Sequence, residues 1–445
     1  SLVFDARCGT LLEDVSPLAV HAIRQVCLLN KKLLLDCSDE RIRKSYDSYL
    51  ETDRSVAEFE QRLQPFWTYS PNDLRDVANS CDAKECEIRH CDESAPDGEL
   101  YDNPGAIPGC RARSTNAPVD LEYFRSISGL LWAGLFSADS FRIDARRVVP
   151  RHGPGATAER ISGNRKYVPL RWHQRLDHWF PASDFLLPNA GWQEQLSEIQ
   201  FVSPEQEDPV RVITVPKTQK GPRIIAIEPV CMQYTQQALM EILVERLEQY
   251  APTKGRVNFT DQTVNQALAL SSSKDGRLAT IDLKDASDRV SARLVAEMLH
   301  NQPLFRELVF ATRTTSADVP GRGIYSISRF ASMGSAMCFP IEAMVFYTIC
   351  VMAIHKAERY PLSPRGLYKA LRDVRVYGDD IIVPVQYVQI VRSELEDFNL
   401  RVNTNKTFAT GKFRESCGLD AYDGVPVTPV YARRLLPQAR RDAEE

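Results

Sequence analysis

The chain has 445 residues, of which 43% are hydrophobic and 26% charged, and its formal net charge at pH 7 is −4. These values are typical of a globular protein and exclude the fibrous and disordered classes, and the length predicts two or three subdomains. We find no signal-peptide pattern and no run that must span a bilayer, so we expect no membrane partner. The eleven cysteines, an odd number scattered over a long chain, favour reduced thiols over a disulfide framework.

The first part of the chain combines helical and acidic segments. Residues 10–80 predict mostly helices with polar faces. Residues 81–118 predict an acidic loop, because eight acids and two bases lie between Asp82 and Asp102. In this loop the run CDAKECEIRHC offers a conceivable zinc site, although its spacing is not a paired CxxC pattern. The candidate zinc ligands are Cys81, Cys86, His90 and Cys91.

A basic segment follows. From Arg142 to Arg175 there are nine bases and two acids, with aromatic residues interleaved. This pattern predicts a polyanion partner such as RNA, and a solvated basic face is the alternative that the charge count leaves open. The candidate RNA contacts are Arg151, Arg165 and Lys166.

Two strand-like runs, VRVITV (210–215) and IIAI (224–227), flank a basic loop. In this loop Lys217, Lys220 and Arg223 recur at every third residue. On paired strands such a loop can aim several cations at one triphosphate. A surface hairpin with solubilising lysines is the alternative interpretation.

Acidic residues stand at the ends of two further predicted strands. The run LATIDL (278–283) predicts a strand that carries Asp282 near its end, followed by a helix that Asp285 or Ser287 can cap. The run VRVYGDDIIVP (374–384) predicts strand, tight turn and strand, with Gly378 supplying positive φ. This pattern places Asp379 and Asp380 at the hairpin tip.

Adjacent carboxylates repel each other, and a shared divalent cation relieves that repulsion. If a sheet brings Asp282 next to Asp379 and Asp380, the oxygen ligands suit two Mg²⁺ ions, or Mn²⁺ in their place. Two such ions can activate a 3′-hydroxyl and stabilise a leaving pyrophosphate. Ordinary turn chemistry is the alternative explanation of the Gly-Asp-Asp sequence.

The apolar run at 337–354 is of ambiguous length for a membrane span. Pro340 and Glu342 near its start argue for a core helix instead.

Several motifs together resemble a known family. IDLKDASD (281–288), SMGSA (332–336), VYGDD (376–380) and NKTF (405–408) stand in the order of the palm motifs of viral RNA-directed RNA polymerases. TDQTVNQ (260–266), DGRLAT (275–280), AIEP (226–229) and FRESCG (413–418) resemble the replicase beta subunit of positive-strand RNA bacteriophages, the Q-beta-like levivirus family. The run CFPIE (338–342) departs from the coliphage form and is similar to metagenomic or narnavirus- and ourmiavirus-type relatives.

The resemblance implies an α+β right-hand fold of fingers, palm and thumb, with an antiparallel palm sheet flanked by helices. Residues 1–150 would form a helical N-terminal region and outer fingers, and 151–277 would form fingers with the basic loop. Residues 278–430 would form the palm, and 431–445 the start of a short or truncated thumb.

The resemblance also implies roles for individual residues. Asp282, Asp379 and Asp380 would be catalytic metal ligands, and Lys406 would be the general acid for pyrophosphate, with a surface lysine as its alternative. The nucleotide-binding residues would be Lys217, Lys220, Arg223, Asp288, Ser332 and Gly334. Asp288 would accept a hydrogen bond from the ribose 2′-hydroxyl, or else interact with a helix dipole. Ser335 departs from the asparagine of the Q-beta type.

The implied activity is template-directed RNA synthesis from ribonucleoside triphosphates, replicating a positive-strand RNA genome in the cytoplasm of a bacterial host. RNA template and product would be partners, together with host elongation factors Tu and Ts and a ribosomal protein. A reverse transcriptase is one alternative, which the small residues Ala286 and Ser287 beside Asp288 disfavour. A catalytically silent RNA-binding scaffold is the other, although RNA binding alone gains nothing from clustered acids.

Overall fold

The fold is taken from a computed structural model of the chain, which describes residues 3–4, 12, 15–34, 37–63, 119–136, 148–161, 163–167, 171–187, 189–218 and 221–433. The predicted acidic loop, its cysteine and histidine cluster, Lys220 and most of the predicted thumb segment lie outside the described residues. The described cysteines are free thiols, as predicted, and they are Cys27, Cys37, Cys231, Cys338, Cys350 and Cys417.

Helices and strands are mixed along the chain, and the predicted α+β class is confirmed. The α-helices are α1 (Pro17–Leu28), α2 (Asp39–Arg62), α4 (Leu121–Trp132), α6 (Gln174–Asp177), α7 (Ala182–Phe185), α8 (Val230–Gln249), α9 (Thr263–Asp275), α10 (Ala292–Met298), α11 (Pro303–Ala311), α12 (Cys338–Ala357), α13 (Pro364–Ala370) and α14 (Val388–Asp397). The strands are β1 (Arg171–His173), β2 (Gln200–Val202), β3 (Val210–Thr218), β4 (Gly221–Ile227), β5 (Leu278–Ile281), β6 (Leu283–Lys284), β7 (Ser316–Val319), β8 (Gly323–Ser326), β9 (Arg375–Tyr377), β10 (Asp380–Pro384), β11 (Arg401–Val402), β12 (Phe413–Ser416), β13 (Leu419–Tyr422) and β14 (Val425–Pro426). Short 3₁₀ helices cover Gly163–Tyr167, Ala190–Glu198, Pro204–Gln206, Ser287–Arg289 and Val385–Tyr387.

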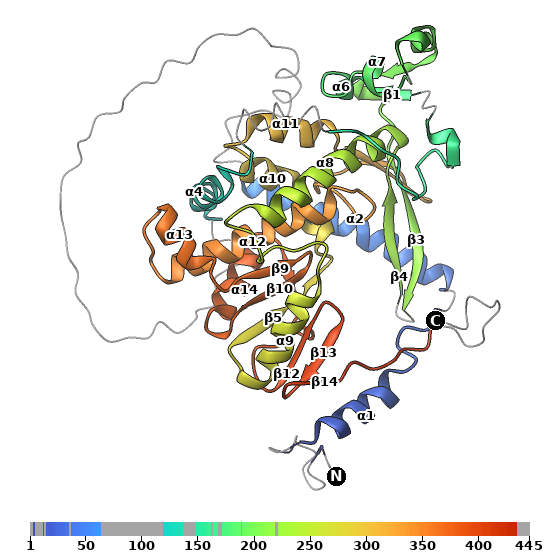
Figure 1. Ribbon diagram of the computed structural model, residues 1–445. Helices are drawn as coiled ribbons and strands as arrows, with labels where there is room; N and C mark the ends of the chain where they lie inside the picture. The colour runs from blue at the N-terminus through green and yellow to red at the C-terminus, as the bar shows by residue number, and fades with distance from the viewer. Residues whose placement is uncertain are drawn as a thin grey trace, which may run out of the picture.

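The centre of the molecule is a three-stranded antiparallel sheet in the order β5-β10-β9. Helix α12 runs beside this sheet and belongs to the largest hydrophobic cluster, together with residues of α4, α8, α10 and α14 (Figure 1). The helix is long and apolar enough to cross a membrane, yet 94% of its most apolar window is buried inside the protein. It is therefore a core helix, as predicted.

A second sheet, in the order β4-β3-β7-β8, carries the basic hairpin. The hairpin β3–β4 is antiparallel, as the sequence predicted, and it projects from the body of the molecule (Figure 1). Tyr46 and Tyr49 of α2 pack into one cluster with Val210, Val212 and Ala226 of this hairpin. Helix α2 therefore braces the base of the hairpin.

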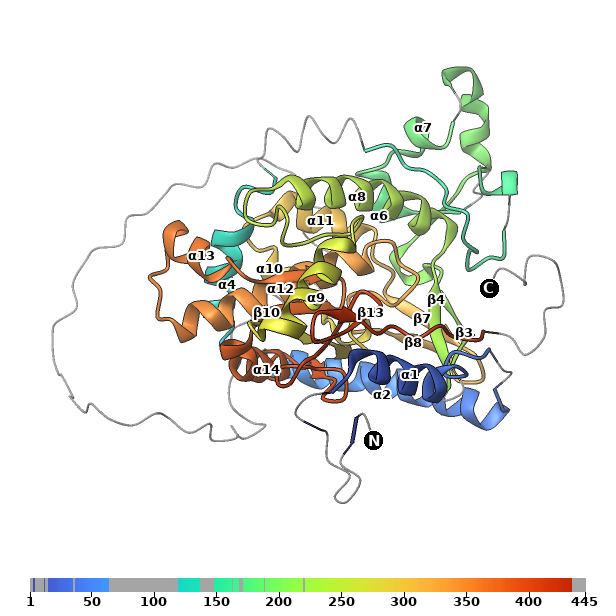
Figure 2. The same cartoon turned by 60° about the horizontal axis from the view of Figure 1, so that its bottom comes forward.

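A third sheet, β12-β13-β14, is contacted by the N-terminal helix α1. Helix α1 lies close to the C-terminal strands in both views (Figures 1 and 2), and Val20 packs with Phe413, Tyr422 and Val427. Arg24 of α1 forms an ion pair with Asp420 of β13. The two ends of the described chain thus stabilise one another.

One prediction about local structure was wrong. The segment after β5 does not continue into a helix capped by Asp285 or Ser287. Asp285 adopts φ +51°, the next turn is the 3₁₀ helix Ser287–Arg289, and α10 begins after Ser291. The side chain of Ser291 accepts the amide of Leu294 and is the true N-cap.

Candidate active site

Three acidic side chains meet at one end of the central sheet. Ile281 of β5 stands opposite Ile381 of β10. One residue beyond this pair stand Asp282 on one strand and Asp380 on the other, so the register brings the two to the same end of the sheet. Asp379 lies in the turn that joins β9 to β10. The convergence predicted from residues almost one hundred positions apart is therefore present.

The turn is tight for a local reason. Gly378 has φ +58°, a left-handed conformation that suits glycine. The ring of Phe339, from the first turn of α12, fills the space that a side chain at position 378 would need. Phe339 also packs edge-on against Tyr377, with ring centroids 5.6 Å apart. These contacts fix the position of Asp379 and Asp380.

The acids repel one another in partly dry surroundings. Burial and the charge of Asp379 raise the pKa of Asp380 to about 7. Burial and the charge of Asp282 likewise raise the pKa of Asp379. A nearby cation would lower both values, because it favours the ionised carboxylates.

The carboxylates are held by protein partners. Asn403 donates to Asp282 at 2.7 Å, and Lys406 lies 3.4 Å from the other Asp282 oxygen. Lys406 lies equally close to Glu415, and Asp380 accepts the amide of Cys417 at 3.1 Å. Within the described ranges, no three histidine, cysteine, aspartate or glutamate side chains stand as a group that could hold a metal ion. The carboxylates must turn away from these partners before they share one.

Lys406 is a cation placed between two acids. Partial burial favours its neutral amine, but the charges of Asp282 and Glu415 outweigh burial and raise the pKa of Lys406. It is therefore an ammonium at neutral pH. Glu415 and Asn403 were not predicted, although Glu415 lies in the FRESCG motif and Asn403 lies two residues before the NKTF motif.

The basic hairpin approaches the same acids. Desolvation and the charge of Arg223 lower the pKa of Lys217, while Asp379 and Asp282 act in the opposite direction. Arg223 stands on β4 opposite Val215 of β3. The side chains of Lys217 and Arg223 are both exposed to solvent. Lys217 and Arg223 thus border the acidic end of the sheet.

Asp288 lies in an ion pair that the sequence did not reveal. Its carboxylate is 2.8 Å from Nη1 of Arg329, whose side chain is completely buried. Arg329 lies in the SRF sequence just before the SMGSA motif, and nothing in its spacing marked it as buried. Tyr49 and Asp53 of α2 complete the surroundings of its guanidinium.

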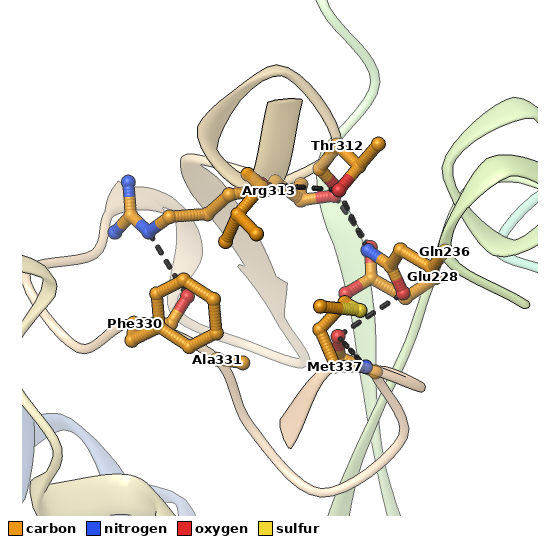
Figure 3. Close-up of a pocket in the computed structure, with 10 residues that line it drawn as sticks. Glu228, Gln236, Thr312, Arg313, Phe330, Ala331 and Met337 are labelled. Carbon is orange, nitrogen blue, oxygen red and sulfur yellow. Dashed lines mark hydrogen bonds between the residues drawn. The ribbon is translucent and has the colours of Figure 1, made fainter. Parts of the chain in front are cut away.

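The loop 332–336 is fixed against β4 and α8. Gly334 has φ +131°, and a β-carbon there would lie 2.0 Å from the carbonyl oxygen of Ala226. Gln236 of α8 accepts the hydroxyl of Ser335 at 3.0 Å and donates to the carbonyl of Thr312 at 2.8 Å. Figure 3 shows the small buried pocket that Gln236 lines together with Glu228. Ser335 is thus engaged in holding the loop.

A buried carboxyl underlies the site. Glu342 of α12 is buried, and burial together with the charges of Asp379 and Asp288 raises its pKa well above the usual value. The thiol of Cys338 lies 3.9 Å from its carboxyl. Burial thus disfavours a further negative charge on Glu342 beneath the acids.

The predicted RNA contacts do not form one group. Arg151 is exposed and pairs with Glu241 at 2.6 Å, and Arg165 is exposed. The ammonium of Lys166, by contrast, is buried and donates to the carbonyls of Gly153 and Gly155. This geometry gives Lys166 a structural role in the loop that contains Gly153 and Gly155, so the expectation that it contacts RNA finds no support here.

The chain is similar to RNA-directed RNA polymerase subunits of phages. The chain is 32% identical over 265 residues to the RNA-directed RNA polymerase subunit beta of Escherichia virus Qbeta, covering 58% of this chain and 42% of that protein. It is 35% identical over 223 residues to the RNA-directed RNA polymerase beta chain of Escherichia phage MS2, covering 50% and 37%. Residues 198–440 match the family described as RNA replicase, beta-chain, and the chain belongs to that family. It spans about two-fifths of the length of these curated relatives.

Solved viral polymerases are more distant. The RNA-dependent RNA polymerase of a human picorbirnavirus aligns at 12% identity with a TM-score of 0.36, covering 50% of this chain and 46% of that one. The BmCPV RNA-dependent RNA polymerase at elongation state aligns at 8% identity with a TM-score of 0.38, covering 67% and 28%.

Proposed function

We propose that this chain carries the catalytic core of a template-directed RNA polymerase that joins ribonucleoside triphosphates on an RNA template. The observation that supports this most directly is the meeting of Asp282 with Asp379 and Asp380 at one end of β5 and β10. Family membership favours the same activity. In this proposal the segment 278–430 is the palm and 151–277 belongs to the fingers.

Divalent cations fit the chemistry of the three acids. Oxygen ligands suit Mg²⁺ or Mn²⁺, and the raised pKa values of Asp379 and Asp380 mark a repulsion that a cation relieves. Asp282 and Asp379 would hold the ions with help from Asp380. Once bound, such ions supply activation of a 3′-hydroxyl and stabilisation of a leaving pyrophosphate.

The surrounding cations act on the substrate. Lys217 and Arg223, with Lys220 on the same loop, would neutralise the triphosphate as it approaches the acids. The ammonium of Lys406 would donate its proton to the departing pyrophosphate, and its raised pKa means that it carries that proton at neutral pH. Release of Lys406 from Asp282 would also free that carboxylate.

Sugar recognition would fall to the residues around the 3₁₀ turn. Asp288 keeps 22% of its side chain exposed and can accept a hydrogen bond from a ribose 2′-hydroxyl. Ser332 and Gly334 would shape the nucleotide site from the neighbouring loop. RNA would contact exposed cations such as Arg151 and Arg165.

The test is an incorporation assay with purified protein, a short RNA template and either ribo- or deoxyribonucleoside triphosphates, with Mg²⁺ or Mn²⁺. We expect template-dependent incorporation of ribonucleotides that a chelator abolishes. Preferential use of deoxyribonucleotides would instead indicate a reverse transcriptase, and RNA binding without any incorporation would indicate a scaffold.

The relatives named above come from bacteriophages. We therefore infer that the protein acts in the cytoplasm of a bacterial host. The association with elongation factors Tu and Ts and a ribosomal protein, which the sequence resemblance implies, is a separate proposal. Co-purification of those proteins with the tagged chain from bacterial cells tests it.

A further inference from the structure

Arg329 is a fully buried cation that joins three separate segments of the chain. Its Nε lies 2.9 Å from Asp53 of α2, and its Nη1 lies 2.8 Å from Asp288. Its Nη2 donates to the carbonyl of Tyr49 at 2.5 Å. The ring of Tyr49 stacks on the guanidinium, with Cζ 3.9 Å from the ring centroid. Nε and Nη2 thus donate hydrogen bonds, Nη1 forms an ion pair, and one face of the guanidinium contacts the Tyr49 ring.

Arg329 has two carboxylate partners, Asp53 and Asp288, which is one more than a buried arginine requires. A buried arginine needs one good carboxylate partner. Asp53 is that partner, because it accepts a hydrogen bond from Nε of Arg329. Asp53 also accepts the backbone amides of Ser328 and Arg329, so this pair is fixed to the backbone. The second carboxylate, Asp288, is the less buried one, because 22% of its side chain is exposed against 14% for Asp53. Arg329 therefore reaches from a rigid anchor to a carboxylate that borders the proposed nucleotide site.

Helix α2 makes a second contact with the proposed nucleotide site, through Tyr49 and Ser332. The hydroxyl of Tyr49 lies 2.9 Å from that of Ser332, in a buried hydrogen bond. Tyr49 thus contacts Arg329 with its ring and carbonyl, and Ser332 with its hydroxyl. Tyr49 is therefore linked to Ser332 directly and to Asp288 through Arg329.

We propose that Tyr49, Asp53 and Arg329 form a clamp that positions Asp288 and Ser332 to recognise the ribose of the incoming nucleotide. This inference rests on the proposed polymerase function and adds its sugar specificity. The clamp residues do not touch the substrate, so they are positioning residues that act through Asp288 and Ser332. Helix α2 lies outside the segment 198–440 that matches the family, so the clamp draws on chain beyond the matched region.

The geometry predicts a specific kinetic signature. A guanidinium anchored on Asp53 fixes the direction in which the Asp288 carboxylate can accept a 2′-hydroxyl. Loosening that anchor weakens the contact with the 2′-hydroxyl, and a 2′-deoxynucleotide makes no such contact. The kcat/KM for ribonucleotides should therefore fall, while the kcat/KM for deoxyribonucleotides should stay largely the same.

The experiment compares kcat/KM for a ribonucleoside triphosphate and its 2′-deoxy form in the wild-type protein and in Asp53→Asn. We expect the ribo-to-deoxy ratio to fall by roughly tenfold, because a hydrogen bond to a charged partner is lost. Tyr49→Phe keeps the ring over Arg329 but removes the bond to Ser332, and it should lower the ratio by a smaller factor. Equilibrium titration of both nucleotides gives the same comparison without turnover.

A matched control lies on the same helix. Asp47 of α2 forms an exposed ion pair with Arg322 at 2.7 Å, whereas Asp53 pairs with Arg329. Asp47→Asn should leave the ratio unchanged. Thermal unfolding of each variant checks that it folds.

The outcomes separate the clamp from the function on which it rests. Equal losses for both nucleotides in Asp53→Asn would show a merely structural role and overturn the clamp. An unchanged ratio in both clamp variants would do the same. Absence of ribonucleotide incorporation and binding by the wild-type protein would instead overturn the proposed function.

Discussion

The ring of Phe339 lies so close to Gly378 that a β-carbon at position 378 would stand 1.9 Å from ring carbon Cε2. Gly378 and Asp379 form the turn between β9 and β10, Asp380 is the first residue of β10, and Phe339 is the second residue of the core helix α12. The position of Asp379 and Asp380 therefore depends on a contact between the turn and α12 and on the turn's own backbone.

Gly378→Ala should consequently impair catalysis and stability together. The left-handed backbone alone costs about 1–3 kcal/mol for a residue with a side chain, and the methyl group must also displace Phe339 or the turn. We expect a large loss of incorporation, measured as kcat, with RNA binding retained. The control is Gly276→Ala, which has φ +69° and no atom within 4 Å of the added carbon. An equal effect of both substitutions would show that the Phe339 contact is unimportant.

Replacement of a turn acid tests the metal proposal directly. Asp379→Asn keeps the shape of the side chain but removes a charge, so it should reduce incorporation by at least about a hundredfold. RNA affinity, measured by filter binding, should stay nearly the same because the acids do not bind the polyanion. Asp318→Asn, on the exposed face of β7, should affect neither measurement. Undiminished incorporation by Asp379→Asn would remove the metal site.

The basic hairpin should control nucleotide affinity. Lys217→Ala and Arg223→Ala each remove a cation that borders the acids, and we expect each to raise the apparent KM for nucleotides by roughly tenfold. Arg277→Ala removes an exposed arginine that precedes β5, and its KM should match that of the wild type. A change confined to template affinity would assign Lys217 and Arg223 to the RNA channel instead.

His152 gives the fold a pH dependence. Burial, aided by the charge of Lys166, lowers the pKa of His152 from 6.5 to about 4. The unfolded chain therefore takes up a proton at a higher pH than the folded chain. The neutral His152 side chain therefore makes its full contribution to the free energy of unfolding above about pH 6.5. This contribution is lost as the pH falls towards 4.

His152→Phe should remove this dependence and keep the stack on Tyr234, whose centroid lies 4.4 Å away. The free energy of unfolding of the wild type should fall, relative to the variant, by on the order of 1 kcal/mol between about pH 7 and pH 4, after allowance for partial exposure. Denaturant titrations at both pH values measure the difference. Parallel pH profiles would show that His152 titrates normally.

Much of the fold and of the candidate site could be predicted from local sequence. The alternation in VRVITV, the glycine before the paired acids and the apolar run of α12 each encode a structure within a few residues, and all three predictions were confirmed. The helix expected directly after β5 was wrong, because the left-handed Asp285 and the cap at Ser291 delay it. Both features depend on neighbours that local propensity does not include.

The sequence by itself determined the chemistry of this protein, namely which acids and bases stand at strand ends and turns, because backbone geometry and side-chain type are local properties. Only the tertiary structure decided which of them meet. It set Lys406 between Asp282 and Glu415, buried the ammonium of Lys166, and brought α2 to Arg329. Burial and long-range ion pairs depend on how distant segments pack, and no spacing along the chain encodes that directly.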